Sequence, residues 1–86
     1  MNLKSKEEIT DVAKGIIAKA LGIDVAEISM TEEFVQLGMD SLQSMFVLDD
    51  LEKKLDMQIN PLLFWEHPTL GSLVDELYEL QKKNPA

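Results

Sequence analysis

Apolar side chains recur at helical spacing through most of this 86-residue chain. In residues 6–21 they fall three and four positions apart, which places them along one side of an α-helix. Residues 41–56 and 70–81 repeat this pattern, and a shorter segment, 61–66, begins with a proline that suits a first helical turn. No segment alternates apolar and polar residues as a half-buried strand does. The sequence therefore predicts an all-α, four-helix bundle with three main helices and one short helix.

The predicted helix ends carry residues that can satisfy unpaired backbone groups. Ser5 and Glu8 form a capping-box pattern before the first helix, and Gly22 suits its carboxyl end. Asp40 is the predicted cap of the second helix, with Gln43 available for the reciprocal bond. Asn60 is the predicted cap of the short helix, and His67 before Pro68 is expected to end it. Thr69 is the candidate cap of the last helix.

A long first connection, residues 22–40, joins the first two main helices. Loops longer than about 12–15 residues without their own structure are uncommon in compact domains, so we expect this one to pack onto the core. A short helical turn is expected at residues 31–34, and residues 82–86 are expected to fray. The predicted core comprises Ile9, Val12, Ile16, Ile17, Ala20, Ile28, Phe34, Val47, Leu48, Leu51, Leu55, Ile59, Leu73, Val74 and Leu77.

The composition argues against several classes of site. The chain has no cysteine and one histidine, and its acidic connection lacks the spacing of a calcium-binding EF-hand loop, so no metal site is predicted. No apolar run is long enough to span a bilayer, and residues 1–9 show no secretory signal. A chain of this length buries only about 60–65% of its unfolded surface. We expect one domain, residues 1–86, acting as a cytoplasmic monomer.

The negative charge of the chain is concentrated in its middle. The formal net charge is −8, from eight lysines and sixteen acidic residues. Residues 20–52 contain eight of the acids and no lysine, whereas acids and lysines balance in the rest of the chain. Nucleic acid and anionic membranes need a basic face and are not expected partners. The acidic segment is either a solvated surface or, as its overlap with Ser41 favours, a docking surface for basic proteins.

Ser41 is the main candidate for chemistry. It follows a glycine turn and the predicted cap Asp40, so its hydroxyl should lie at a helix N-terminus, where unpaired N–H groups favour a phosphate. This placement suits modification by another enzyme, although a serine is also common as the first residue of a helix. A catalytic triad with His67 is not expected, because the G-x-S-x-G pattern is absent.

The second predicted helix has more apolar residues than its core side needs. Placing residues at 100° intervals puts Leu42 and Phe46 away from the core stripe, with Met45 at the boundary. These three residues are predicted to form an exposed patch with an acidic rim of Asp40, Asp49 and Asp50.

Residues 37–42, Leu-Gly-Met-Asp-Ser-Leu, resemble the attachment motif of acyl carrier proteins. A long acidic connection precedes the motif and an amphipathic helix follows it, as in that family. Residues 64–73, which begin Phe-Trp-Glu-His-Pro-Thr, look like the closing segment of polyketide-synthase carriers. The resemblance covers residues 9–80.

The resemblance implies a role for each matching residue. Ser41 would carry 4′-phosphopantetheine, taken from coenzyme A, and Asp40 would contribute to recognition by a phosphopantetheinyl transferase. Leu42 and Met45 match positions that contact partners. The chain would be no enzyme: it would hold an acyl chain as a thioester for a ketosynthase, an acyltransferase or other acyl-processing enzymes of polyketide or fatty-acid-type biosynthesis. Phe46 departs from the glutamate common in the family.

Two alternatives remain from the sequence. One is an unmodified acidic helical adaptor that binds basic proteins through the second helix. The other is a peptidyl carrier of nonribosomal synthesis, a class that usually has a Gly-Gly pair. The single Gly38 and the aspartate before Ser41 favour an acyl carrier.

Overall fold

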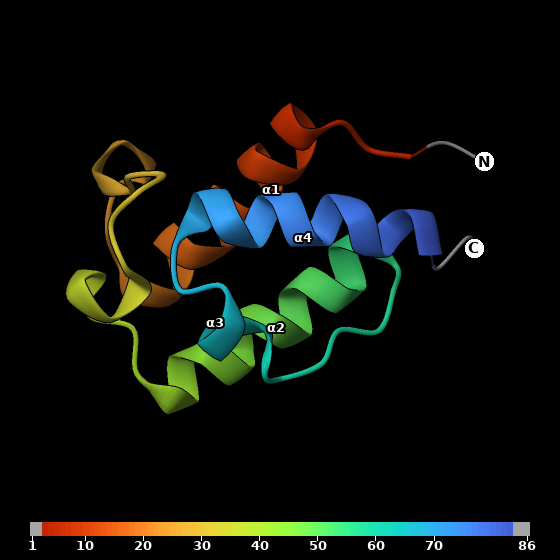
Figure 1. Ribbon diagram of the computed structural model, residues 1–86. Coiled ribbons are helices and arrows are strands. Elements are labelled where there is room, and N and C mark those ends of the chain that lie inside the picture. Colours follow the sequence, from red (N-terminus) through yellow and green to blue (C-terminus); the bar gives the residue numbers. More distant parts are fainter. Residues whose placement is uncertain (1–2, 84–86) are drawn as a thin grey trace.

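The structure is a computed structural model that describes residues 3–83. Helices account for all of its regular structure apart from one isolated bridge between Glu33 and Thr69, so the all-α prediction is confirmed (Figure 1). No helix within residues 3–83 is long and apolar enough to cross a membrane. The elements are α1 (Lys6–Leu21), η1 (Val25–Glu27), η2 (Phe34–Leu37), α2 (Ser41–Leu55), α3 (Leu63–Glu66) and α4 (Leu70–Lys83).

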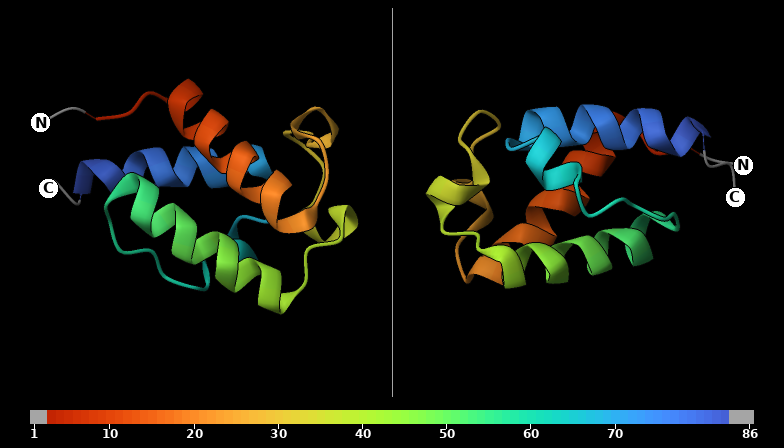
Figure 2. Two further views of the ribbon diagram at one scale, coloured as in Figure 1. Left: turned by 180° about the vertical axis from the view of Figure 1, so that it is seen from behind. Right: turned by 60° about the horizontal axis from the view of Figure 1, so that its bottom comes forward.

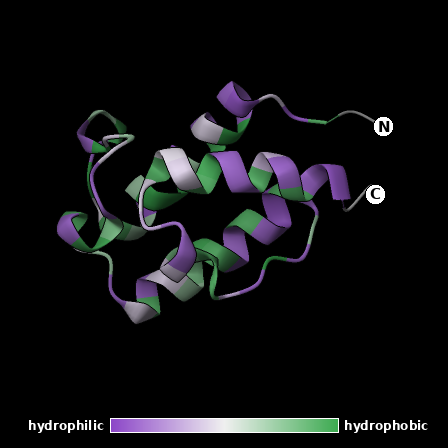
Figure 3. Ribbon diagram, in the orientation of Figure 1, coloured by the Kyte–Doolittle hydropathy of each residue, from purple (hydrophilic) through white to green (hydrophobic). Residues whose placement is uncertain are grey.

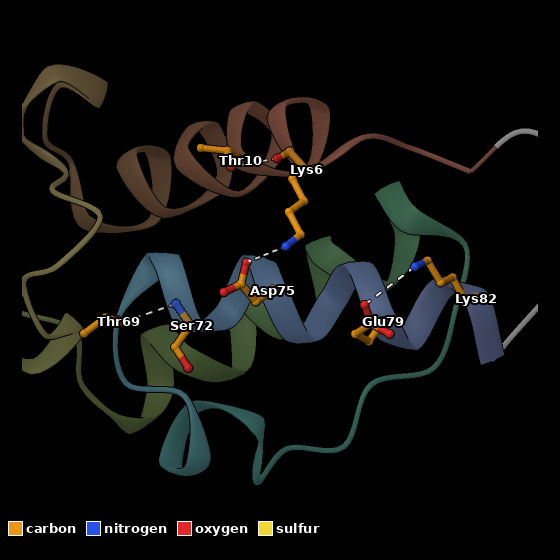
Figure 4. A network of polar contacts seen from close by, with 7 residues as sticks. All are labelled: Lys6, Thr10, Thr69, Ser72, Asp75, Glu79 and Lys82. Atoms are coloured by element: carbon orange, nitrogen blue, oxygen red, sulfur yellow. Dashed lines mark hydrogen bonds and ion pairs between the residues drawn. The ribbon is translucent and has the colours of Figure 1, made fainter.

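The long helices begin where the capping residues predict. Ser5 Oγ accepts the Glu8 N–H at 3.1 Å, and the Glu8 carboxylate accepts the Ser5 N–H at 2.9 Å. Thr69 Oγ1 accepts the Ser72 N–H at 3.3 Å at the start of α4 (Figure 4). Gly22 ends α1 in the left-handed conformation, with φ of 69°. Each cap satisfies a backbone group that a helix end would otherwise leave unpaired.

Helix α1 packs against both α2 and α4, and the short α3 bridges the space between α2 and the start of α4 (Figure 2). Apolar and polar segments alternate along the long helices, as expected when one side of each helix is buried (Figure 3). The ion pair from Lys6 Nζ to Asp75 Oδ1, at 3.1 Å, joins α1 and α4 at the surface (Figure 4). The largest fully buried side chains are Ile9, Ile17, Val47, Leu51, Leu70, Leu73 and Leu77.

Most of the predicted core is buried. Val12, Ala20 and Leu55 are exceptions, since they lie at the edges of their apolar stripes and are only partly buried. The buried apolar residues missing from the prediction are Ala13, Ala18, Met39, Met57, Leu63 and Leu70. Met39 and Met57 lie outside helices, where no periodicity signals burial.

Several predicted boundaries differ from the structure by one or two residues. Helix α2 ends at Leu55, because Asp56 adopts a left-handed conformation with φ of 53°. Helix α3 begins at Leu63; Asn60 Oδ1 instead accepts the Leu62 N–H at 2.9 Å and caps the preceding turn. Helix α4 continues through Lys83, so the fraying predicted for residues 82–83 is wrong, and residues 84–86 lie outside the described part.

The long connection packs down, as predicted, and is hydrogen-bonded to the segment between α3 and α4 and to the first turn of α4. The N–H of Phe34 donates to the Pro68 carbonyl at 2.9 Å, and the N–H of Gly71 donates to the Met30 carbonyl at 2.9 Å. Phe34 is buried and meets Phe64 edge-on, with ring centroids 5.8 Å apart. A helical turn was expected at residues 31–34. The structure instead has the short helix η2 at Phe34–Leu37. These contacts fix the loop that leads into α2.

Candidate functional site

Ser41 is the first residue of α2 and is exposed. Within residues 3–83 its hydroxyl has no hydrogen-bond partner. The nearby Ser44 differs, because its hydroxyl donates to the Asp40 carbonyl at 2.8 Å and is thereby committed to the helix. Ser41 therefore presents a free hydroxyl at the helix N-terminus, as the sequence predicts.

The first turn of α2 is held by Asp40 and Gln43. Asp40 Oδ1 accepts the Gln43 N–H at 2.8 Å, and Gln43 Oε1 accepts the Asp40 N–H at 3.0 Å. The N–H groups of Ser41 and Leu42 have no acceptor among the described residues. Free N–H groups at a helix N-terminus attract anions, and phosphate in particular. The residues around Ser41 therefore fit a phosphodiester on its hydroxyl.

The turn before Ser41 is built on η2. Gly38 has φ of 100°, a conformation that favours glycine, and its N–H donates to the Val35 carbonyl at 3.2 Å. The next N–H, that of Met39, donates to the Phe34 carbonyl at 3.1 Å. The Met39 side chain is buried, so it anchors the chain directly before Asp40. This geometry places Ser41 at the surface on a fixed turn.

A groove of about 770 Å³ runs beside Ser41 between α2, η2 and α3. Its floor includes the buried side chains of Phe34, Met39 and Leu48. Its other lining residues are Glu33, Val35, Asp40, Ser41, Ser44, Met45, Pro61, Phe64, Trp65 and Pro68. An apolar groove that reaches the Ser41 hydroxyl leaves room for an attached flexible group.

Leu42, Met45 and Phe46 project from α2 with exposed fractions of 61%, 66% and 60%. We call these three residues the α2 patch. Its exposure agrees with the helical phasing of the sequence, in which the opposite side of α2 holds the buried Val47 and Leu51. Large apolar side chains grouped on a surface are typical of protein interaction sites.

The acids predicted to surround the α2 patch differ in their environments. Asp40 is exposed but used as a helix cap, and Asp50 is half-buried. Asp49 Oδ2 lies 3.1 Å from Lys53 Nζ, and the hydrogen bond that Lys53 donates to Asp49 raises the pKa of Lys53 above its ordinary value. The Asp49 charge is therefore partly offset within the helix.

His67 is hydrogen-bonded to Ser72 and not to Ser41. Its Nδ1 lies 2.6 Å from Ser72 Oγ, a contact that links the end of α3 to the first turn of α4. Within the part of the chain that the structure describes, no group of three or more His, Cys, Asp or Glu residues could hold a metal ion.

Most residues that line the groove were absent from the predicted site, which included only Asp40, Ser41 and Met45 among them. Val35 and Trp65 line the groove from η2 and α3, and Met39 forms part of its floor. Met39 lies two residues before Ser41 in the sequence, whereas only the folded chain brings Val35 and Trp65 next to Ser41. Their apolar character was the one signal available in the sequence.

Comparison with known proteins agrees with this geometry. Residues 11–77 match the family model described as "Phosphopantetheine attachment site". The non-reducing polyketide synthase adaA of Aspergillus niger is 41% identical over 58 residues, covering 67% of this chain and 3% of the synthase. Atrochrysone carboxylic acid synthase of Passalora fulva is 35% identical over 71 residues, covering 83% of this chain and 4% of the synthase. The chain thus spans a small fraction of these relatives.

Solved structures of carrier proteins share the fold. A free-standing peptidyl carrier protein from Acinetobacter baumannii superposes with a TM-score of 0.83 at 25% identity, covering 88% of this chain and 95% of that one. The HMG-ACPI domain from the CurA module of Lyngbya majuscula gives a TM-score of 0.85 at 23% identity, covering 100% and 87%.

The match to the family extends over most of the helical core and includes the Ser41 turn. Members of this family hold 4′-phosphopantetheine covalently and interact with acyl-processing enzymes, and they do not themselves catalyse a reaction. The chain therefore belongs to the phosphopantetheine attachment site family and is a carrier domain of the polyketide-synthase type.

Proposed function

We propose that Ser41 is the residue that carries 4′-phosphopantetheine. The observation that supports this most directly is its exposed hydroxyl, free of internal hydrogen bonds, beside the unpaired N–H groups of α2. Ser44 is the nearest alternative hydroxyl, but it is half-buried and bonded to the Asp40 carbonyl. Of the two, only Ser41 can be reached without breaking a helix contact.

The modification requires a partner enzyme, for which we propose a phosphopantetheinyl transferase. The Ser41 oxygen would bond to the β-phosphorus of coenzyme A, its proton would pass to a base of the transferase, and 3′,5′-ADP would leave. The attached arm supplies a terminal thiol, which the cysteine-free chain lacks, to hold an acyl group as a thioester. Asp40 would contribute by holding the first turn of α2 and by presenting its charge beside Ser41.

The partners that use the loaded carrier are proposed to be a ketosynthase, an acyltransferase or related enzymes, which dock on the α2 patch. The patch offers apolar contact area, while Asp40, Asp49 and Asp50 would steer basic surfaces toward it. Because Lys53 offsets Asp49 and Asp50 is half-buried, the exposed Asp40 should contribute most to steering. The domain is proposed to act as a monomer.

Polyketide assembly is the proposed pathway class. Relatives at 35% and 41% identity are polyketide synthases, whereas the peptidyl carrier named above shares 25% identity. Peptidyl carriage is therefore the second candidate, and fatty-acid-type synthesis remains an expectation from the motif. Coenzyme A is an intracellular metabolite, which supports the expectation of a cytoplasmic location.

Intact-mass measurement tests the attachment site. The wild-type protein, incubated with a broad-specificity transferase and coenzyme A, should gain the mass of one phosphopantetheine. Ser41→Ala should keep its helical circular dichroism and gain nothing. The matched control Ser44→Ala, altered three residues further along the same helix, should still be modified.

Two results would contradict the proposal. Mass gain in Ser41→Ala would place the group on another residue. Absence of gain in the folded wild-type protein would favour the unmodified adaptor. Loading the modified protein with malonyl or aminoacyl groups from coenzyme A donors, followed by transfer to a ketosynthase or a condensation domain, separates acyl from peptidyl carriage.

A further inference from the structure

Phe34 contacts three separate parts of the molecule. Its carbonyl accepts the N–H of Met39 at 3.1 Å, in the turn before Ser41. Its N–H donates to the Pro68 carbonyl at 2.9 Å, in the segment between α3 and α4. Its ring meets the ring of Phe64 in α3 edge-on, with centroids 5.8 Å apart and an interplanar angle of 75°. One residue therefore joins the turn before Ser41 to α3 and to the segment that leads into α4.

The turn between Phe34 and Ser41 leaves the chain little freedom. The N–H of Gly38 donates to the carbonyls of Phe34 and Val35. The side chain of Met39 is buried, and α2 begins two residues later with Ser41. A displacement of the Phe34 backbone must therefore either move Ser41 or break the hydrogen bonds of this turn.

Helix α3 depends on tertiary contacts for its position. It is four residues long, and a helix of this length is not stable on its own. Leu63 is buried, and the half-buried Phe64 adds the edge-on contact with Phe34. Such aromatic pairs stabilise a fold beyond the apolar area that they bury. The position of α3 and the position of Phe34 therefore depend on each other.

The neighbouring backbone contacts do not depend on the two aromatic rings. An isolated bridge pairs Glu33 with Thr69, and the N–H of Gly71 donates to the Met30 carbonyl at 2.9 Å. These contacts can hold the long connection against the start of α4 whichever side chains stand at positions 34 and 64. A substitution in the aromatic pair therefore tests the ring contact while the connection remains attached.

We propose that Phe34 and Phe64 are positioning residues for the modification of Ser41, an inference that rests on the proposed function. Their ring contact keeps α3 and the turn before Ser41 in one arrangement, and it acts on Ser41 through the hydrogen bond between Phe34 and Met39. Without the contact, the Ser41 hydroxyl would spend less time in the orientation that the transferase requires. Orientation of a reacting group affects the chemical step, so the loss should appear in kcat more than in KM.

Amide hydrogen exchange of the unmodified protein tests the coupling without a partner enzyme. Phe64→Leu should increase exchange at the Met39 N–H at least about threefold more than at the N–H of Leu77. Leu77 is fully buried in α4, so its amide reports the change in global stability. The control Trp65→Leu, which alters the adjacent but exposed side chain of α3, should leave the Met39 exchange unchanged.

Kinetics of modification test whether the coupling matters for Ser41. With a broad-specificity transferase and coenzyme A, Phe34→Leu and Phe64→Leu should each lower kcat about three- to tenfold and change KM by less than about twofold. The double variant should lose little more than either single variant, because all three lack the same contact. Phe64→Tyr keeps the ring and should restore kcat.

A matched control separates positioning from general loss of stability. Leu77→Val removes buried volume from α4, which contributes no residue to the lining of the groove beside Ser41. Measured at a temperature at which circular dichroism shows every variant to be folded, Leu77→Val should retain the wild-type kcat.

Three results would overturn the inference. Met39 exchange that rises in Phe64→Leu only as much as Leu77 exchange would indicate general destabilisation. An unchanged kcat in the folded Phe34→Leu and Phe64→Leu variants would show that the contact does not position Ser41. A change in KM alone would mean that the rings affect binding of the transferase. In each case the wild-type protein would still gain one phosphopantetheine, whereas failure of the proposed function would be seen as no gain in the wild-type protein.

Discussion

Gly71 and Met30 are in direct backbone contact: the Gly71 N–H donates to the Met30 carbonyl at 2.9 Å. A Cβ at position 71 would lie 3.1 Å from the same oxygen. The first turn of α4 thus lies against the loop that leads to Ser41, and glycine allows this approach.

Gly71→Ala should therefore be less favourable than an alanine replacement in an open helix position. Gly15 in α1 is the matched control, because its Cβ would meet nothing within 4 Å. Gly15→Ala should stabilise the protein by about 0.5–1 kcal/mol through helix propensity. Crowding against Met30 should cancel that gain at position 71. Urea unfolding measures the free energy of unfolding of both variants. Equal stabilisation by the two substitutions would show that the loop at Met30 moves aside without a loss of stability.

Leu51→Ala should destabilise the domain by about 2–5 kcal/mol, because it empties a site in the core. Leu51 is fully buried on the inner side of α2. Leu42→Ala, on the outer side of the same helix, should change stability by less than about 0.5 kcal/mol. Chemical denaturation of the pair tests the phasing of α2. A loss below about 1 kcal/mol for Leu51→Ala would contradict its place in the core.

Asp56→Gly should stabilise the protein by about 0.5–1 kcal/mol, because Asp56 ends α2 with a left-handed φ of 53°. Its carboxylate also lies at the negative end of the helix dipole. Asp56→Asn removes the charge but keeps a side chain that tolerates this conformation, so comparison of the two melting curves separates charge from backbone strain. Destabilisation by glycine would show that the Asp56 side chain makes a favourable contribution.

Glu8 should make the stability of α1 depend on pH. Hydrogen bonds from the Ser5 backbone and then the Ser5 side chain lower the pKa of Glu8 below 4.5. A lowered folded-state pKa gives stability that is present above the unfolded-state value and is lost as the pH falls through the folded-state value. Glu8→Gln should therefore melt below the wild-type protein near neutral pH, and the difference should shrink below pH 4.5. A difference that persists unchanged in acid would contradict this linkage.

Phe46→Glu should leave the melting temperature nearly unchanged, because the Phe46 side chain is 60% exposed and lies away from the core. It should impair acyl transfer to a ketosynthase that accepts the wild-type protein, since it places a charge in the α2 patch. Acyl transfer to the ketosynthase is measured at low and at high salt. Steering by the acidic residues around the α2 patch should be weaker at high salt. Unfolding of the variant would mean that Phe46 supports the core, and unchanged transfer would remove it from the interface.

The helical parts of the fold could be predicted from the sequence because their information is local. The spacing of Ile9, Ile16 and Ile17 specifies one buried side of α1, and the Ser5–Glu8 pattern specifies its start. The motif around Ser41 likewise combines a glycine turn, a cap and an amphipathic helix within a few residues. Periodicity and capping act over one or two turns, so both can be read without tertiary structure.

The connections and the surroundings of Ser41 depended on contacts between distant segments. The bonds from Phe34 to Pro68 and from Gly71 to Met30 join residues that no local pattern pairs. The α3 helix starts later than Pro61 suggested, because the preceding residues form a turn capped by Asn60.

The sequence by itself determined the helices, the acidic middle of the chain and the place of Ser41 at the start of α2. Only the tertiary structure decided that Met39 is buried beneath that turn, and that Val35 and Trp65 meet α2 at one groove. The physical reason is that helix formation and capping use neighbouring residues, whereas burial outside helices and the shape of a groove depend on which distant segments pack together.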